Sequence, residues 1–260
     1  MNFSKIPVGL LIIMVIVAII ILIEAGYRFG KMIFLKRTPE KDGVVSSISG
    51  YVLALIAFIM AFTFSIVSSR YDTKKSLVRE ESNIIRTVWF RSDFLPDSDR
   101  VATKRLLISY VDTRLVGIQT KNEAAIEESL VKCRQIQQLL WNIAVANGHK
   151  DLNSDVAALY VEALNDMITI HYTRVGVSLY ARVPGGIWLI LMIMVTLGMM
   201  MVGYMSAITG SNRSWAFIIL AMTFAMVVGM LYTMDKLYSP FTPISQLPMQ
   251  QLLDFMRSNL

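Results

Sequence analysis

The sequence predicts an all-α, polytopic membrane protein with four transmembrane helices and a helical region inserted between the second and the third. Of its 260 residues, 55% are hydrophobic and 17% are charged. That leaves too few charged side chains to cover a water-soluble globule of this size. Four long stretches lack Asp, Glu, Lys, Arg and His altogether, and the region between the second and third has mixed charge with helical spacing.

The four uncharged stretches cover residues 6–23, 44–69, 183–212 and 214–234. A helix needs roughly 18 or more apolar residues to cross a bilayer core about 30 Å thick. Helices are favoured because every backbone amide in lipid must be satisfied within the protein. We therefore predict a first membrane segment, 1–69, with spans at about 6–25 and 44–69, and a second, 183–236, with spans at about 185–209 and 214–234.

Residues 70–182 are predicted to form a helical, water-exposed domain. No glycine or proline occurs between Gly50 and Pro96, so the second span is expected to leave the membrane and continue to about Phe90 as one rod. Further helices are expected after Pro96, from 122 to 147, and from 154 or 155 to 182. Residues 237–260 are predicted to form a proline-rich connector and a short helix over about 249–258.

The positive charge is concentrated beside the membrane. The net charge is +6, yet residues 70–182 hold 16 Lys and Arg against 14 Asp and Glu. The excess lies at Arg28, Lys31, Lys36, Arg37 and Lys41, where lipid headgroups rather than nucleic acid are the expected partners. Basic residues near the other span ends favour an inner-membrane protein whose middle domain lies in the cytoplasm, although the basic first loop favours the opposite orientation.

No enzyme motif is present: the sequence lacks G-x-S-x-G, Walker A, H-E-x-x-H and G-x-G-x-x-G. Cys133, the single cysteine, excludes an intramolecular disulfide and a cysteine-rich metal site. We expect no enzyme, cofactor or metal, with His149 and His171 in packing or surface roles. The carboxylates are expected on solvated faces and at helix caps; they are Glu80, Glu81, Asp93, Asp97 and Asp99.

The spans carry no ionisable residue near their centres, which argues against a proton- or substrate-coupled transporter. Glu24 falls at a span end, where interfacial solvation accounts for it. Any transport by this protein is therefore expected to be passive.

Two neighbouring stripes run along the second span. A stripe of small residues has the spacing of a close helix contact; it comprises Gly50, Ala54, Ala57 and Ala61. The other stripe consists of large, mostly apolar residues followed by two serines; it comprises Tyr51, Leu55, Phe58, Phe62, Ser65 and Ser69. Around an axis, several copies of the second stripe would form an apolar constriction that gates ions by dewetting. Packing of the aromatic residues on other helices or lipid is the alternative.

Four segments of the chain together carry a resemblance to a known family. They are AFTFSIVSSRYD (61–72), LVREESNIIRTVWFRSDFLPDSDR (77–100), LLISYVDTR (106–114) and MDKLYSPFTPISQLPMQQLL (234–253). In this order they resemble the bestrophin-like family of bacterial membrane proteins, also labelled DUF4239, over nearly the whole chain.

The resemblance implies a pentameric ion channel whose second helix lines the pore. By position it implies Phe58 and Phe62 as the neck, with Ser65 and Ser69 below. Bestrophins that respond to calcium carry an acidic run after the fourth span, whereas this chain has only Asp235 there. The expected partners are lipid, further copies of the chain and inorganic ions. The alternative is a non-conducting sensor or scaffold whose cytoplasmic helices bind a protein.

Overall fold

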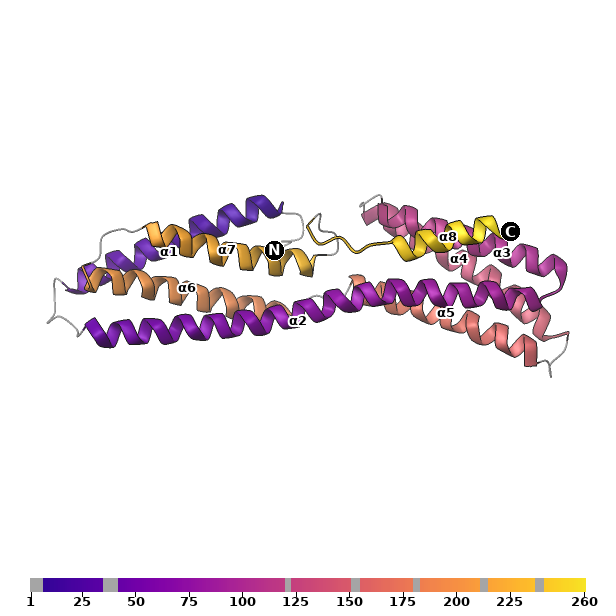
Figure 1. Ribbon diagram of the computed structural model, residues 1–260, viewed down its shortest axis with the longest axis horizontal. Coiled ribbons are helices and arrows are strands. Elements are labelled where there is room, and N and C mark those ends of the chain that lie inside the picture. Colours follow the sequence, from indigo (N-terminus) through magenta and orange to yellow (C-terminus); the bar gives the residue numbers. More distant parts are fainter. Residues whose placement is uncertain are drawn as a thin grey trace. The chain divides into compact units, whose positions relative to one another are not determined.

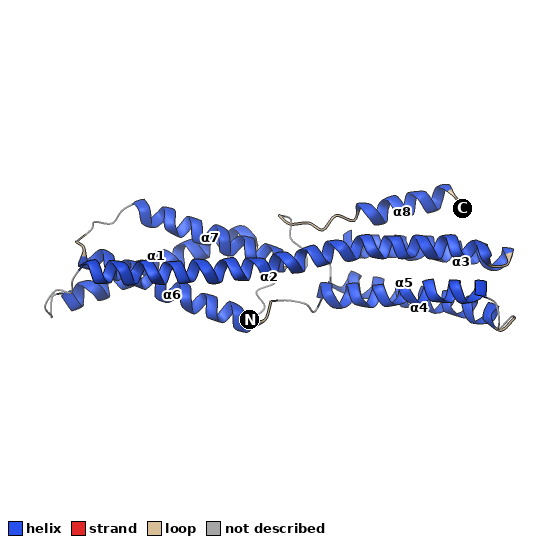
Figure 2. Cartoon of the chain, turned by 60° about the horizontal axis from the view of Figure 1, so that its bottom comes forward, coloured by secondary structure: helices blue, strands red, loops and turns tan. Residues whose placement is uncertain are grey.

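The computed structural model describes residues 7–34, 42–119, 123–150, 155–179, 183–210, 215–236 and 241–260. Within these ranges the regular elements are all helical, as predicted, and Figure 2 shows no strand in the described parts. The chain divides into two compact units. Unit 1 comprises Met1–Tyr71 and Arg182–Thr242, and unit 2 comprises Asp72–Ala181 and Pro243–Leu260.

Among the described residues, four helices are long and apolar enough to cross a membrane, and their uncharged parts belong to unit 1. They are α1 (Val8–Phe34), the first part of α2 (Asp42–Arg91), α6 (Gly185–Ile208) and α7 (Trp215–Asp235). Helix α1 packs against both α6 and α7 (Figure 1). Because α2 has no charged residue between Asp42 and Arg70, we assign its uncharged stretch, 44–69, to the membrane.

Helix α1 is longer than predicted: it continues to Phe34 instead of ending near residue 25. Charged residues appear at Glu24 and Arg28, but the helix continues past them, and α6 lies against this part of α1. A Cβ added at Gly26 would lie 2.0 Å from the Met200 carbonyl oxygen, and one added at Gly203 would lie 2.0 Å from that of Ile23. Glycine is therefore required on both helices, as in a small-x-x-x-small contact.

The remaining contacts of unit 1 join α2 and α7 to the other helices. The buried α2 side chains Ile56, Met60 and Val67 share a cluster with Leu191 of α6 and Leu231 of α7. Three small residues of α7 are also buried; they are Ala221, Ala225 and Gly229. At the end of α7, the Asp235 Oδ1 atom accepts a hydrogen bond of 2.9 Å from the Val183 amide.

Unit 2 is a helical bundle built from the last part of α2, the short 3-10 helix η2 (Ser92–Phe94) and helices α3 (Asp97–Gln119), α4 (Glu123–Gly148), α5 (Asp155–Leu179) and α8 (Leu247–Ser258). Pro96 lies directly before α3, where its missing amide costs no helical hydrogen bond. The largest fully buried side chains of this core are Trp89, Tyr110 and Tyr160.

Helix α8 packs into the core of unit 2. Its buried face consists of Met249, Leu252, Leu253 and Met256. Two polar contacts hold its ends: Ser82 Oγ donates to the Pro248 carbonyl oxygen at 3.0 Å, and Arg257 pairs with Asp112 at 3.1 Å.

Several residues used in the sequence predictions lie outside the described residues. They are the loop residues Lys36, Arg37 and Lys41 and the helix-end positions Asn122, Ser154 and Arg182.

Candidate functional site

The membrane part of α2 presents a continuous exposed stripe of large apolar side chains. Its members recur at alternating steps of four and three residues: Val44, Ile48, Tyr51, Leu55, Phe58 and Phe62. Their exposed fractions range from 47% at Ile48 to 75% at Tyr51. A repeat of 3.5 residues is the spacing of a helix that meets copies of itself around an axis.

Both predicted stripes of α2 lie on its exposed surface. Phe58 and Phe62 are 67% and 62% exposed, and Ser65 and Ser69 continue the line beyond them, also exposed. The stripe of small residues is exposed as well: Gly50, Ala54, Ala57 and Ala61. A Cβ added at Gly50 would meet no atom within 4 Å. Within one chain, these small residues therefore leave room beside α2 that the described helices do not fill.

The chemistry of this surface is simple. Between Val44 and Ser69 the stripe carries apolar side chains, one phenol at Tyr51 and hydroxyls at its end, with no group that is charged at neutral pH. Such a surface binds no ion by charge and transfers no proton. What it offers to a solute is apolar surface and hydroxyl dipoles.

A second polar feature lies inside unit 2. We name it the Glu81 cluster: Glu81, Tyr110, Arg114, His171 and Arg174. Arg114 Nε and Nη2 both donate to the Glu81 carboxylate at 3.1 Å, which is a bidentate pair. Arg174 also donates to Glu81, and its Nη2 atom donates to Gln246 Oε1 at 2.7 Å. The cluster thus joins α2, α3, α5 and the residue that precedes α8.

The expectation that Glu81 lies on a solvated face or at a cap is wrong. Its side chain is fully buried, whereas Glu80 is exposed. Burial alone would raise the pKa of Glu81, but the charges and hydrogen bonds of Arg114 and Arg174 outweigh it and lower this pKa to about 2. Glu81 is therefore an anion at neutral pH, held between two cations.

His171 and Tyr110 complete the cluster. The Tyr110 hydroxyl donates to Glu81 Oε1 at 3.2 Å and lies 2.9 Å from His171 Nδ1. Because its proton is directed to the carboxylate, we assign the Nδ1–H tautomer to His171, which then donates to the phenol oxygen. Burial, reinforced by the charge of Arg114, lowers the pKa of His171 to about 4. His171 is neutral at pH 7.

Sequence reasoning missed this cluster although a signal was present. Glu81 falls in register with Val78, Ile85 and Val88, all buried on the same face of α2. A charged residue at a core position of an amphipathic helix must find a partner, since an isolated buried charge is very costly. The partners were not readable, because Arg114 and Arg174 are 33 and 93 positions away from Glu81.

Three of the remaining candidate carboxylates, Asp93, Asp97 and Asp99, form ordinary ion pairs. Asp93 pairs with Lys104 at 2.6 Å, and Asp99 accepts hydrogen bonds from Asn147 at 2.9 Å and Lys150 at 3.3 Å. No group of three or more His, Cys, Asp or Glu side chains with metal-binding geometry occurs among the described residues. Cys133 is buried, and burial raises the pKa of its thiol to about 11, which makes the thiol a poor nucleophile.

Four apolar helices and a helical bundle define a polytopic, all-helical membrane protein. The bestrophin-like domain profile matches residues 14–246. The chain therefore belongs to the bestrophin-like family, which confirms the resemblance seen in the sequence. No curated protein matches the chain in sequence.

Solved structures agree on the fold. A crystal structure of a mutated bacterial bestrophin homologue from Klebsiella pneumoniae is 16% identical and covers 96% of each chain, with a TM-score of 0.63. Another structure of the Klebsiella pneumoniae homologue is 16% identical and covers 97% of each chain, with a TM-score of 0.62. A crystal structure described as a mutated membrane protein is 16% identical and covers 97% of this chain and 96% of that chain, with a TM-score of 0.65.

Proposed function

We propose that this protein is a homo-oligomeric ion channel, a pentamer, whose pore is lined by the exposed large-residue stripe of α2. The observation that carries the proposal is that stripe: six large apolar side chains at heptad spacing, left uncovered by the other helices described in the chain. Membership of the bestrophin-like family supports it.

In the proposed assembly, Phe58 and Phe62 form the neck. Aromatic side chains from all copies form rings that narrow the pore and exclude water, which hinders the passage of a hydrated ion. Ser65 and Ser69 follow as a vestibule in which hydroxyls replace part of the ion's hydration. The small stripe lets the neighbouring α2 helices approach closely enough to close the ring.

Conductance in planar bilayers tests the neck. We expect ion current from the purified wild-type protein and a severalfold larger current when Phe58→Ala and Phe62→Ala are combined, because the constriction widens. Ile219→Ala is the matched control: Ile219 is 65% exposed on α7 and lies outside the stripe. The control should conduct like the wild type.

The oligomer mass separates this proposal from its rival. A pentamer in mild detergent has a protein mass close to five times 29.3 kDa. A monomer or dimer that stays silent under potassium and chloride gradients, with both neck substitutions silent too, would overturn the channel. It would favour the non-conducting sensor or scaffold.

For the orientation, we place unit 2 in the cytoplasm of a cell whose inner membrane holds unit 1. Basic side chains follow the second span at Arg70, Lys74, Lys75 and Arg79, which the positive-inside rule assigns to the cytoplasm. A reporter enzyme that is active only outside the cytoplasm, fused after residue 260, should be inactive. Activity of that fusion would reverse the orientation.

A further inference from the structure

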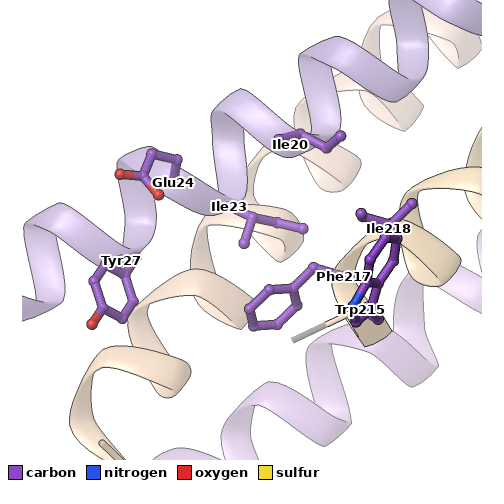
Figure 3. Close-up of a pocket in the computed structure, with 7 residues that line it drawn as sticks. All are labelled: Ile20, Ile23, Glu24, Tyr27, Trp215, Phe217 and Ile218. Carbon is purple, nitrogen blue, oxygen red and sulfur yellow. The ribbon is translucent and has the colours of Figure 1, made fainter. Parts of the chain in front are cut away.

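An apolar pocket of about 230 Å³ lies between α1 and α7 in unit 1 (Figure 3). Ile20 and Ile23 of α1 line it together with Phe217 and Trp215 of α7. Along α1, the lining then changes from aliphatic residues to Glu24 and Tyr27 (Figure 3). The pocket therefore has an apolar part and a polar end.

Two aromatic residues of the lining indicate the depth of the pocket in the bilayer. Trp215 is the first residue of α7, and its side chain is 79% exposed. Tyr27 lies on α1 where charged residues first appear. Tryptophan and tyrosine at span ends are typical of the level of the lipid headgroups. The polar end of the pocket thus meets the headgroups, and its apolar part meets the acyl chains.

An ion pair stands at this polar end. Arg28 Nε lies 2.9 Å from Glu24 Oε1, one helical turn away on α1, and the Arg28 side chain is 77% exposed. The pair thus presents a carboxylate beside the pocket and an accessible guanidinium next to it. A guanidinium is well matched to a phosphate, and a carboxylate to a primary ammonium.

We propose that this pocket binds a phospholipid with a primary-ammonium headgroup, of the phosphatidylethanolamine class. Its acyl chain lies against Ile20, Ile23 and Phe217, its ammonium binds Glu24 and its phosphate binds Arg28. The zwitterionic headgroup complements the Glu24–Arg28 pair. A trimethylated ammonium has no proton to donate to Glu24, and a glycerol headgroup has no positive charge, so both should bind more weakly.

Native mass spectrometry of the intact protein tests the headgroup preference. The protein would be titrated with an equimolar mixture of dioleoyl-phosphatidylethanolamine, -phosphatidylcholine and -phosphatidylglycerol. We expect the ethanolamine adduct to dominate for the wild type. Glu24→Gln should reduce its preference over the choline lipid by roughly tenfold, the effect of losing one charge-assisted hydrogen bond.

Two further variants separate the parts of the site. Arg28→Gln should weaken binding of all three lipids, because each has a phosphate. Ile20→Trp should do the same by filling the apolar part. Glu128→Gln is the matched control, because Glu128 forms an i,i+4 pair with Lys132 at 2.7 Å and neither residue lines this pocket.

Equal binding of the three lipids by the wild type, or an unchanged ethanolamine preference in Glu24→Gln, would overturn the proposal. So would a pocket filled by a second copy of the chain, which would appear as lipid-free oligomers. The helical content and melting temperature of each variant are measured alongside, so that misfolding is not read as lost binding. The readout is independent of conductance.

Discussion

At the residue scale, the Glu81 cluster makes the core of unit 2 sensitive to acid. Glu81 is ionised in the folded state because Arg114 and Arg174 flank it, and His171 is neutral because it is buried beside those cations. Both groups bind protons more readily in the unfolded chain. Acid therefore shifts the equilibrium toward unfolding through each of them.

The two groups act in different pH ranges. The ordinary pKa of histidine is 6.5 and that of His171 is about 4, so its destabilising effect grows as the pH falls from about 6.5 to 4. The ordinary pKa of glutamate is 4.5 and that of Glu81 is about 2, so the stability that its ionisation provides is present above about pH 4.5 and is lost as the pH falls toward 2.

We predict that His171→Asn removes most of the change in stability between pH 6.5 and 4. The asparagine amide keeps one donor toward Tyr110 and does not titrate. In the wild type this range should cost unit 2 on the order of 2 kcal/mol. The measurement is the thermal unfolding midpoint against pH, followed by tryptophan fluorescence, to which Trp89 in the same core contributes.

His149→Gln is the control for this prediction, because His149 is exposed. It should keep the wild-type pH dependence. If His171→Asn showed the same dependence as the wild type over that range, His171 would not be the titrating group.

At the element scale, the tightest contact of unit 1 is the crossing of α1 and α6. Gly26 and Gly30 on α1 and Gly203 and Ala207 on α6 are each four residues apart. A Cβ added at Gly30 would come within 2.9 Å of the Ala207 Cβ. The helices meet backbone to backbone here, which packs them well in lipid without a hydrophobic driving force.

We predict that Gly203→Ala destabilises unit 1 by about 1–3 kcal/mol or more, as overpacking does. The new methyl group would meet the Ile23 carbonyl oxygen, a backbone atom that cannot swing away. Gly9→Ala is the matched control, since nothing lies within 4 Å of a Cβ there. It should leave stability unchanged or raise it slightly.

Thermal unfolding in detergent, followed by near-ultraviolet circular dichroism, compares the two variants. Equal midpoints for Gly203→Ala and Gly9→Ala would show that the crossing has room for a side chain.

Most helices of this fold could be predicted from the sequence, but the helices and side chains that they contact could not. Runs without charged residues located α6 and α7, and Pro96 and Gly148 mark helix boundaries, because these signals are local. The part of α1 that continues to Phe34 lies beyond the uncharged run that located this span, so that signal does not extend to it. The stripes of α2 were readable from spacing alone, whereas the Glu81 cluster depends on contacts between residues far apart in sequence.

At the scale of the whole molecule, assembly of several copies would cover the α2 surface that is exposed in a single chain. The large and small stripes of α2 run side by side, and both are exposed. In the proposed pentamer, the first faces the axis and the second faces the adjacent copy. Substitutions in the large stripe should then change the conductance, and substitutions in the small stripe should change the assembly.

We predict that Ala57→Phe breaks the oligomer, because a large side chain in the small stripe keeps neighbouring α2 helices apart. The single chain should still fold, since Ala57 is exposed within it. Native mass spectrometry should show lower masses for this variant, and circular dichroism should show unchanged helical content. Ala18→Phe, at an exposed alanine of α1, is the control and should remain assembled. An intact oligomer of Ala57→Phe would remove the small stripe from the interface.

The position of α8 also has a consequence for biosynthesis. Unit 2 begins at Asp72, yet Met249, Leu252 and Met256 of α8 belong to its core. The ribosome must therefore make α6 and α7 before unit 2 can finish packing. Until then, the groove that receives α8 is an exposed apolar surface of the kind that chaperones and proteases recognise. A stop codon before α8 should thus lower the amount of protein in the cell by degradation, even though the four membrane helices have been made.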